Sequence, residues 1–372
     1  MKDSYMQAAE ETQVCPVNSY NEWDPLEEVI VGRLEHAMLP DAQIINKHTF
    51  PPSESPVIDQ ILALGGVPYP TEMIEAAQED LDQFIHILES EGITVRRPDI
   101  VDYETPFRTP AWKVPCGSSA TNPRDPFLVV GNEIIETPMA DRSRYFEAWA
   151  YRSLFTEYFR QGAKWVAAPK PQLTDDQYHD DFQPSQYGDE EMKYVVAEFE
   201  PTFDAADFVR CGTDIIGQKS HVTNGMGILW LGRHLGDQYR IHVIQSRSPQ
   251  AMHIDTTLMP LAPGKILVNP EWVDTQKLPE FLRNWDLLMA PQPALSEQKE
   301  LRLISSWANM NVLMLDEKRV IVEQRQEPMI RALRDWGFEP IPCPFENYYP
   351  FLGSFHCATL DIRRKGTLQS YA

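Results

Sequence analysis

The sequence contains no long hydrophobic run, and basic residues are scarce. No apolar stretch reaches the roughly 18 residues of a membrane-spanning helix, so we expect no membrane association. Lys and Arg number 33 against 55 Asp and Glu, which gives a net charge of −22. Nucleic acids require clustered positive charge, so this composition argues against a nucleic-acid partner. The acidity keeps a protein soluble and can also attract cationic substrates.

Cysteines are also few, and they are scattered along the chain. The five are Cys15, Cys116, Cys211, Cys343 and Cys357. They include no CxxC pair, so we expect neither a disulfide framework nor a closed zinc site. Four of them are typical of small buried apolar side chains. Only Cys357 has neighbours that indicate chemistry.

The chain shows no low-complexity linker that would divide it. We therefore expect a single domain over residues 17–372, preceded by a flexible segment, residues 1–16. The N-terminal residues are polar and acidic and lack the pattern of a secretory signal. We accordingly expect a cytoplasmic protein.

A unit recurs five times, in which a helical stretch is followed by a short apolar strand. The expected helices are residues 73–91, 142–160, 225–235, 276–284 and 327–336. The expected strands are residues 93–98, 163–169, 239–244, 285–291 and 338–344. Hairpins are expected before most of the helices, for example at residues 127–135 and 312–322. Five such units predict a closed, propeller-like α/β ring, and the alternative is an open α/β sheet with five crossovers.

Two distant runs supply the partners that a nucleophilic thiol at Cys357 needs. Residues 252–255 offer His253 and Asp255, and residues 200–208 offer Asp204 and Asp207. A thiol attacks as the thiolate, which a nearby histidine generates or stabilises, and a carboxylate fixes the histidine tautomer.

The spacing of His253 and Asp255 predicts that both side chains lie on one face of a strand. His356 would then point away from the side of Cys357, so we assign it a structural role. Asp207 is more typical of a buried hydrogen-bonding partner than of a catalyst. The alternatives are a buried core thiol at Cys357, a core histidine at His253 and a Cys–His–Asp zinc site, for which the spacing carries no metal signature.

Several long runs resemble the arginine:glycine amidinotransferase family, and the resemblance extends from about residue 18 to the end. The runs are residues 132–140, 203–208, 252–255, 310–319, 354–357 and 361–371. The resemblance implies a five-bladed α/β propeller with pseudo-fivefold symmetry. It also implies transfer of an amidino group from L-arginine to an acceptor amine, with release of ornithine and without a cofactor or metal.

The resemblance implies a role for individual residues. Cys357 falls on the nucleophile, His253 on the general acid and base, and Asp204 on the carboxylate partner of that histidine. The substrate-binding positions implied are Asp125, Asp255, Met252, Trp272, Ser305 and Asn311. Paired carboxylates suit a guanidinium, because it is planar, cationic and carries five donors. A simpler interpretation of Asp125 is that it only marks the start of the strand that begins at Phe127.

The sequence departs from the family pattern beside the substrate. Residues 269–272 read Asn-Pro-Glu-Trp where glycine-using members read Asn-Pro-Asp-Arg, and Gln250 and Ala251 precede Met252 where those members read Asn-Pro. Trp272 cannot donate a bidentate pair to a carboxylate. An aromatic wall suits a longer, more apolar or cationic amine. Within the family, the chain is similar to the branch of cyanobacterial saxitoxin biosynthesis, whose acceptor is an arginine-derived amino ketone without a carboxylate.

Two other functions fit the same residues. A guanidino hydrolase on this fold would use water as the acceptor and form citrulline. The alternative from another class is a non-catalytic binding module. Such a protein would not need Cys357, His253 and Asp204, so the presence of all three argues against it. The expected partners are small molecules, namely L-arginine and an amine, and a homodimer is a possible assembly.

Overall fold

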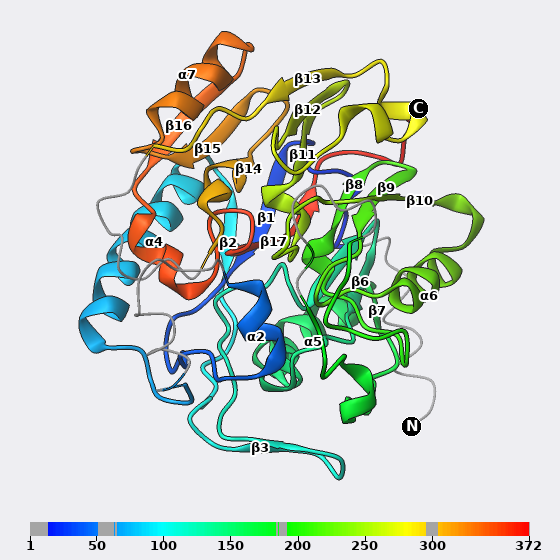
Figure 1. Cartoon of the computed structure of the whole chain (residues 1–372). Coiled ribbons are helices and arrows are strands. Elements are labelled where there is room, and N and C mark those ends of the chain that lie inside the picture. The colour runs from blue at the N-terminus through cyan, green and yellow to red at the C-terminus, as the bar shows by residue number, and fades with distance from the viewer. Residues whose placement is uncertain are drawn as a thin grey trace, which may run out of the picture.

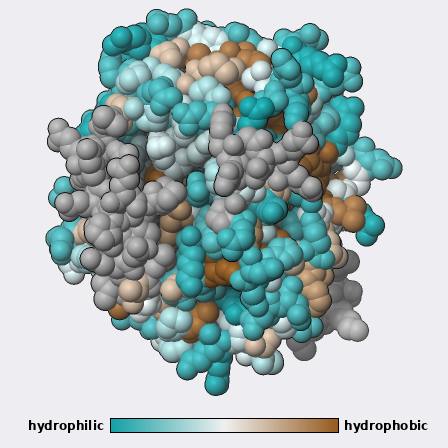
Figure 2. All heavy atoms as spheres, in the orientation of Figure 1, coloured by the Kyte–Doolittle hydropathy of each residue, from teal (hydrophilic) through white to brown (hydrophobic). Residues whose placement is uncertain are grey.

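The computed structural model describes residues 14–50, 63, 65–183, 185, 192–294 and 304–371. Most of the predicted flexible segment, residues 1–13, lies outside the described residues. No helix among the described residues is both long and apolar enough to cross a membrane. Hydrophilic side chains dominate the face shown in Figure 2, with apolar side chains in scattered patches.

Five three-stranded sheets share one pattern, in which an antiparallel pair is followed by a parallel strand. Four of them use consecutive strands. These are β5 (Phe127–Val130), β6 (Glu133–Glu136) and β7 (Lys164–Ala167); β8 (Phe208–Cys211), β9 (Asp214–Gln218) and β10 (Arg240–Ile244); β11 (Leu258–Ala262), β12 (Lys265–Val268) and β13 (Asp286–Met289); and β14 (Leu313–Met314), β15 (Arg319–Glu323) and β16 (Glu339–Cys343). The two predicted hairpins therefore form.

The fifth sheet joins the two ends of the chain. Strand β1 (Leu26–Val31) pairs in parallel with β2 (Thr94–Arg96) and antiparallel with the C-terminal strand β17 (Thr359–Arg364). Figure 1 shows β1 and β17 in the middle of this view and helices α4, α6 and α7 toward the outside. Cys357 comes two residues before β17, so this closure fixes where the thiol lies. A two-stranded hairpin that was not predicted, β3 (Phe107–Arg108) and β4 (Lys113–Val114), lies between β2 and β5.

Three of the five predicted helices form largely as predicted, and two do not. The three are α4 (Thr71–Ser90), α6 (Gly225–Leu235) and α7 (Glu327–Asp335), and a short helix that was not predicted, α2 (Ile44–Thr49), occurs before α4. Residues 276–284 form only the 3-10 turns η7 (Thr275–Lys277) and η8 (Glu280–Leu282), because Pro279 cannot continue a helix.

Residues 142–160 contain a regular helix only in their second half. They begin with the 3-10 turns η1 (Arg142–Arg144) and η2 (Glu147–Tyr151), and α5 (Arg152–Arg160) follows. The Asp141 side chain accepts hydrogen bonds from Ser143, and Arg144 turns into the interior, so local contacts rather than helical periodicity shape this segment.

Aromatic packing supports the loop that carries Cys357. Phe84 of α4 is fully buried, and its ring lies 5.3 Å from Phe345 and 5.1 Å from Phe355. Phe345 and Phe355 stack with their ring centroids 4.3 Å apart. Aromatic pairs of this geometry stabilise beyond their buried area by about 0.5–1.5 kcal/mol each. The segment just before Cys357 is thereby anchored in the core.

A buried charge network connects strands of different sheets behind that loop. Arg210 of β8 donates to Glu22 and to Asp361 of β17 at 2.8 and 2.9 Å, and Arg124 donates to Asp361 at 2.6 Å. Arg364 donates to the same carboxylate at 2.7 Å. Burial opposes ionisation of Glu22, but Arg210 and its neighbours hold the pKa of this carboxyl well below its ordinary value. The network therefore consists of charged, mutually satisfied groups.

Candidate active site

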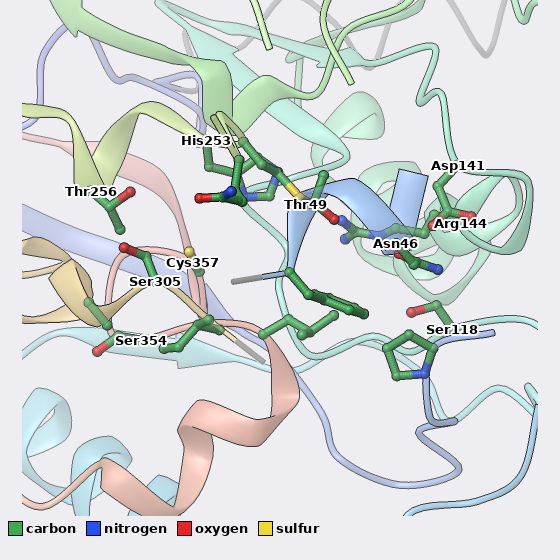
Figure 3. Close-up of a pocket in the computed structure, with 18 of the residues that line it drawn as sticks. Asn46, Thr49, Ser118, Asp141, Arg144, His253, Thr256, Ser305, Ser354 and Cys357 are labelled. Carbon is green, nitrogen blue, oxygen red and sulfur yellow. The ribbon is translucent and has the colours of Figure 1, made fainter. Parts of the chain in front are cut away.

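A cavity of about 170 Å³ collects most of the predicted site residues. The predicted residues that line it are Met252, His253, Asp255, Trp272, Ser305, Asn311 and Cys357. Asp125 and Asp204 do not line it, and both are in contact with His253. Figure 3 shows Cys357 and Ser305 on one side of the cavity, with Asp141 and Arg144 on the other.

The Cys357 backbone is held by one side chain, that of Asn311. The Asn311 Oδ1 atom accepts from the backbone N–H groups of His356 and Cys357 at 2.8 and 3.3 Å. Its Nδ2 atom lies 2.9 Å from Cys357 Sγ and 2.8 Å from Asp255 Oδ2. Gly353 allows the tight loop, because a Cβ atom there would collide with Asn122 Oδ1 and the Cβ atom of Cys357. Asn311 thus positions both the thiol and a carboxylate beside it.

The thiol faces Asp255, whose Oδ2 atom receives three donors. Cys357 Sγ donates to it at 3.1 Å, and His356 Nδ1 and Asn311 Nδ2 lie 3.2 and 2.8 Å away. Burial opposes ionisation of Asp255, but its bonds to His356 and its other neighbours lower its pKa. Burial and the Asp255 charge raise the pKa of the Cys357 thiol to about 12, although His253 opposes this shift. Without a ligand, the sulfur is therefore a protonated thiol at neutral pH.

The backbone at His253 overturns the prediction that it shares a strand face with Asp255. His253 has φ 63° and directly precedes the 3-10 turn η6 (Ile254–Thr256), which ends before β11 begins. A positive φ at a non-glycine residue costs about 1–3 kcal/mol and requires support from the surrounding structure. His356 also lies in a turn outside β17, so the argument from alternating strand faces fails for it as well. The orientations of the His253 and His356 side chains are therefore set by turns and not by a strand.

Two buried carboxylates contact the His253 imidazole. Its Nε2 atom lies 3.1 Å from Asp204 Oδ2, and its Nδ1 atom lies 3.5 Å from Asp125 Oδ1. Burial alone would lower the pKa of His253, but Asp125, Asp204 and the contact with Cys357 raise it well above the ordinary value. The imidazole is therefore protonated at neutral pH, which makes it a proton donor.

Both of these carboxylates keep one oxygen atom without a hydrogen bond. Asp125 Oδ1 and Asp204 Oδ1 are buried and have no hydrogen-bond partner within the described part of the chain. Burial raises the pKa of Asp125, although His253 and Arg144 oppose this shift. A buried acceptor without a donor costs about 1–3 kcal/mol, so a ligand that donated to either oxygen would recover this cost.

Arg144 and Glu147 were not predicted, and they complete the charged environment of His253. Arg144 donates to both oxygens of Glu147 at 2.9 and 2.8 Å and to Asp125 Oδ2 at 2.9 Å. It also lines the cavity. Burial raises the pKa of Glu147 to about 7, and Arg144 opposes this shift. Sequence reasoning missed the pair because a charged i, i+3 pair in an expected helix is usually solvent-exposed.

Asp207 and His356 occupy supporting positions. Asp207 accepts from Ser220 Oγ at 2.6 Å and from Thr223 Oγ1, which in turn accepts from the Asp204 backbone N–H at 3.2 Å. Asp207 is thus a buried hydrogen-bonding partner, as predicted. His356 bridges Asp255 at 3.2 Å and Glu22 at 3.4 Å and so links the cavity to the buried charge network.

Trp272 lines the cavity and is only half-buried. The Asn269 side chain accepts from the backbone N–H groups of Glu271 and Trp272 at 2.9 and 3.2 Å, which fixes the turn that carries the indole. Ser305 begins the 3-10 segment η9 (Ser306–Met310), and its Oγ atom accepts from the Trp307 N–H at 3.0 Å. Among the Lys and Arg residues described, Arg144 is the one that lines this cavity, and it is already paired with carboxylates.

Two groups of side chains among the described residues have the geometry to hold a metal ion. Asp125, His253 and Cys357 place their ligand atoms within 4.8 Å of one another, and so do the exposed residues His36, Asp102 and Glu104. The first group consists of two predicted catalytic residues, His253 and Cys357, and one predicted substrate-binding residue, Asp125. These three side chains can either ligate a metal ion or act as a nucleophile, a general acid and a carboxylate that binds a cation.

Comparison with known proteins identifies the class of protein. No family model matches the chain. An L-arginine:L-lysine amidinotransferase of Pseudomonas savastanoi pv. phaseolicola is 51% identical over 359 residues, which are 96% of this chain and 97% of the relative. A mitochondrial glycine amidinotransferase of Danio rerio is 44% identical over 362 residues, which are 96% of this chain and 85% of the relative.

Solved structures agree with this class. SxtG, described as an amidinotransferase from Microseira wollei in the saxitoxin biosynthetic pathway, is 66% identical with a TM-score of 0.90, and the match covers 96% of this chain and 100% of that one. These similarities over almost the full length define an α/β amidinotransferase fold. The chain belongs to the amidinotransferase family and is an amidinotransferase.

Proposed function

We propose that this enzyme transfers the amidino group of L-arginine to an acceptor amine through an amidino-cysteine at Cys357, and that ornithine is released. One observation carries the proposal. The buried Cys357 thiol, the His253 imidazole and the Asp125 carboxylate lie within 4.8 Å of one another, the pKa of His253 is raised, and Asp125 Oδ1 has no hydrogen-bond partner among the described residues. A guanidinium supplies hydrogen-bond donors in a single plane. The names of similar proteins, one of which includes L-arginine as a substrate, support this donor.

Binding of the donor would activate the thiol. Asp255 and Asp125 raise the pKa of Cys357 in the empty site, and a guanidinium placed against these carboxylates offsets their charge. The thiol then ionises more readily at the moment when the electrophilic carbon is in place. Positioning of the carbon against the sulfur makes attack effectively unimolecular. Asn311 and Ser305 would hold the thiol and the mouth of the cavity in this arrangement.

The first half-reaction forms the S–C bond and breaks the bond between the guanidinium carbon and the ornithine nitrogen. The Cys357 sulfur adds to the carbon to give a tetrahedral intermediate. The thiol proton is released to solvent when the donor binds, so the sulfur adds as the thiolate, and His253 gives its proton to the departing ornithine nitrogen and remains neutral in the amidino-enzyme. In the second half-reaction the acceptor amine attacks the amidino carbon, the neutral His253 takes its proton, the C–S bond breaks, and the released thiolate recovers a proton from solvent as the product leaves. Asp204 would keep the imidazole in place throughout.

The acceptor is best described as an amine without a carboxylate. Trp272 lines the cavity where an arginine would be needed to bind an amino-acid carboxylate, and Met252 adds a further apolar contact. The similarity to SxtG suggests a role in specialised, saxitoxin-type metabolism. The residue runs and the name of that relative support this assignment.

The five similar sheets support a closed, five-bladed α/β propeller with pseudo-fivefold symmetry. Each sheet has one antiparallel and one parallel pair, and β17 completes the sheet of β1 as a closing strand would. We accordingly interpret residues 17–372 as a single domain, located in the cytoplasm and able to form a homodimer. Size-exclusion chromatography with light scattering tests the assembly.

The test of the function is a reaction with L-arginine alone. We expect stoichiometric release of ornithine and one amidino group on Cys357, detected by mass spectrometry of the intact protein and of its peptides. Cys357→Ala is the control and should release no ornithine. An unmodified Cys357 in the presence of arginine, or steady formation of citrulline without an amine, would overturn the proposal, and citrulline would favour the guanidino hydrolase. An amine panel with arginine as donor then identifies the acceptor.

A further inference from the structure

The Arg144–Glu147 pair occupies an unusual position, because a complete ion pair is buried in the wall of a cavity that receives a cation. Arg144 is 7% and Glu147 is 2% exposed. Burying a charged pair is costly unless its geometry is excellent and its remaining hydrogen bonds are satisfied. The Arg144 guanidinium meets this condition, since it donates three hydrogen bonds of 2.8–2.9 Å to two carboxylates. The ion pair between Arg144 and Glu147 would be complete without Asp125, so the additional contact of Arg144 with Asp125 needs its own explanation.

The contact with Asp125 is what distinguishes this pair from a purely structural one. Arg144 Nη2 binds Asp125 Oδ2 at 2.9 Å, and the other oxygen, Oδ1, lies 3.5 Å from His253 Nδ1 without a hydrogen bond. Arg144 Nη1 also lies 3.7 Å from Asp204 Oδ2. Rotation of the Asp125 carboxylate would break its bond to Arg144, and an oxygen of this carboxylate lies within 4.8 Å of both the Cys357 sulfur and a His253 ring nitrogen.

We propose that Arg144, oriented by Glu147, is a positioning residue that aims Asp125 Oδ1 at the guanidinium of the donor. The inference rests on the proposed function and adds to it the residues that prepare the cation site. Glu147 takes both Nε and Nη2 of Arg144, which fixes the plane of the guanidinium. Lysine at position 144 offers a single ammonium and cannot reproduce this plane. The pair therefore acts through Asp125 and does not itself touch the substrate carbon.

The charges around Asp125 explain why a cation is needed there. Facing His253 and Asp125 are Asp204, Asp207, Asp255 and the thiol of Cys357, and burial would favour protonated carboxylates. Arg144 opposes the increase that burial causes in the pKa of Asp125, and this favours the anion that a guanidinium binds. A neutral Asp125 would bind a guanidinium far less tightly, because a hydrogen bond to a charged group is about twice as strong.

The test is a double-mutant cycle on substrate binding in a Cys357→Ala background, which removes the chemistry. Calorimetry with L-arginine measures the Kd of four proteins: the background alone, with Asp125→Asn, with Arg144→Gln and Glu147→Gln together, and with all three changes. Replacing both members of the pair removes the Glu147 charge together with its partner, and Asp125 keeps His253 as a counter-ion at 3.5 Å, so the protein is expected to fold. Arg142→Gln is the matched control from the same 3-10 turn, because Arg142 contacts Leu173 and Asp175 instead.

We expect Asp125→Asn and the paired replacement each to weaken arginine binding at least tenfold, and we expect the triple variant to be no weaker than Asp125→Asn alone. Arg144→Lys should fail to restore binding, whereas Arg142→Gln should bind as the background does. Losses that add in the triple variant, or unchanged binding in the paired replacement, would overturn the inference. Thermal unfolding of the same proteins identifies a variant that has lost its fold. If the paired replacement does not fold, L-arginine binding by the Arg144→Lys variant is the second test.

The unmodified enzyme separates this inference from the proposed function. If it releases ornithine while the losses are additive, the inference fails and the function stands. If it releases none while the cycle is non-additive, the function fails and the positioning role stands. If the Cys357→Ala protein does not bind L-arginine at all, both are refuted.

Discussion

Replacement of Asp204 by Asn tests the role of His253 most directly. The variant keeps the shape of the side chain but removes the charge that lies 3.1 Å from His253 Nε2. A hydrogen bond to a charged group contributes about 1.5–3 kcal/mol, which corresponds to roughly a 10- to 150-fold loss of rate if the bond is needed in the transition state. We therefore expect ornithine release in a single turnover to slow by that factor.

The pH dependence supplies a sharper criterion than the rate alone. Burial would lower the pKa of His253, but Asp125 and Asp204 raise it well above the ordinary value of 6.5. The wild-type proton donor thus stays charged through neutral pH, and its rate should fall only as the pH rises through the raised pKa. Without the Asp204 charge the pKa falls, so the decrease in rate should begin at lower pH. Quenched-flow measurement of ornithine between pH 6 and 9 records both profiles.

The same shift has a consequence for stability. Because the folded-state pKa of His253 is raised, its charge stabilises the folded protein fully below about pH 6.5, and this contribution is lost as the pH rises through the raised value. Asp175→Asn is a control, since Asp175 is exposed and pairs with Arg142 at 2.8 Å. An Asp204→Asn enzyme with the wild-type rate and an unmoved pH profile would refute the assignment of His253 as the proton donor.

Three further predictions concern the acceptor, the core and metals. Trp272→Arg should shift the preferred acceptor toward glycine and other carboxylate-bearing amines, because arginine can bind a carboxylate bidentately; an unchanged product distribution across an amine panel counts against this role of Trp272. Arg210→Met should lower the free energy of unfolding by about 3–5 kcal/mol and raise the midpoint of acid unfolding. The reason is that the pKa values of Glu22 and Asp361 are lowered in the folded protein. The stability that these carboxylates contribute is therefore present above their ordinary pKa values and is lost as the pH falls. An unchanged urea midpoint of the Arg210→Met protein would contradict this prediction. Dialysis against EDTA should leave ornithine release unchanged, since Cys357 is expected to act as a free nucleophile, and restoration of a lost activity by Zn²⁺ would reverse this conclusion.

Local sequence patterns predicted the elements whose stability is mostly local. The apolar spacing of residues 225–235 and 327–336 gave the helices α6 and α7, and the apolar runs flanked by polar turns gave the two hairpins. The prediction was wrong at residues 276–284, because Pro279 interrupts the helix that the apolar spacing indicates. It failed again at His253, because a period-two pattern carries no information about a positive φ that the surrounding structure imposes.

The sequence by itself determined the class of chemistry: a thiol, an imidazole and several carboxylates in runs that resemble an amidinotransferase family, on a strongly acidic chain. Only the tertiary structure decided which atoms meet. It placed Asp255 against the thiol and Asp204 and Asp125 against His253, and it turned Arg144 and Glu147 inward. These contacts join segments that lie far apart in the chain, and the orientation of each carboxylate depends on partners from other sheets, which no local pattern of residues encodes.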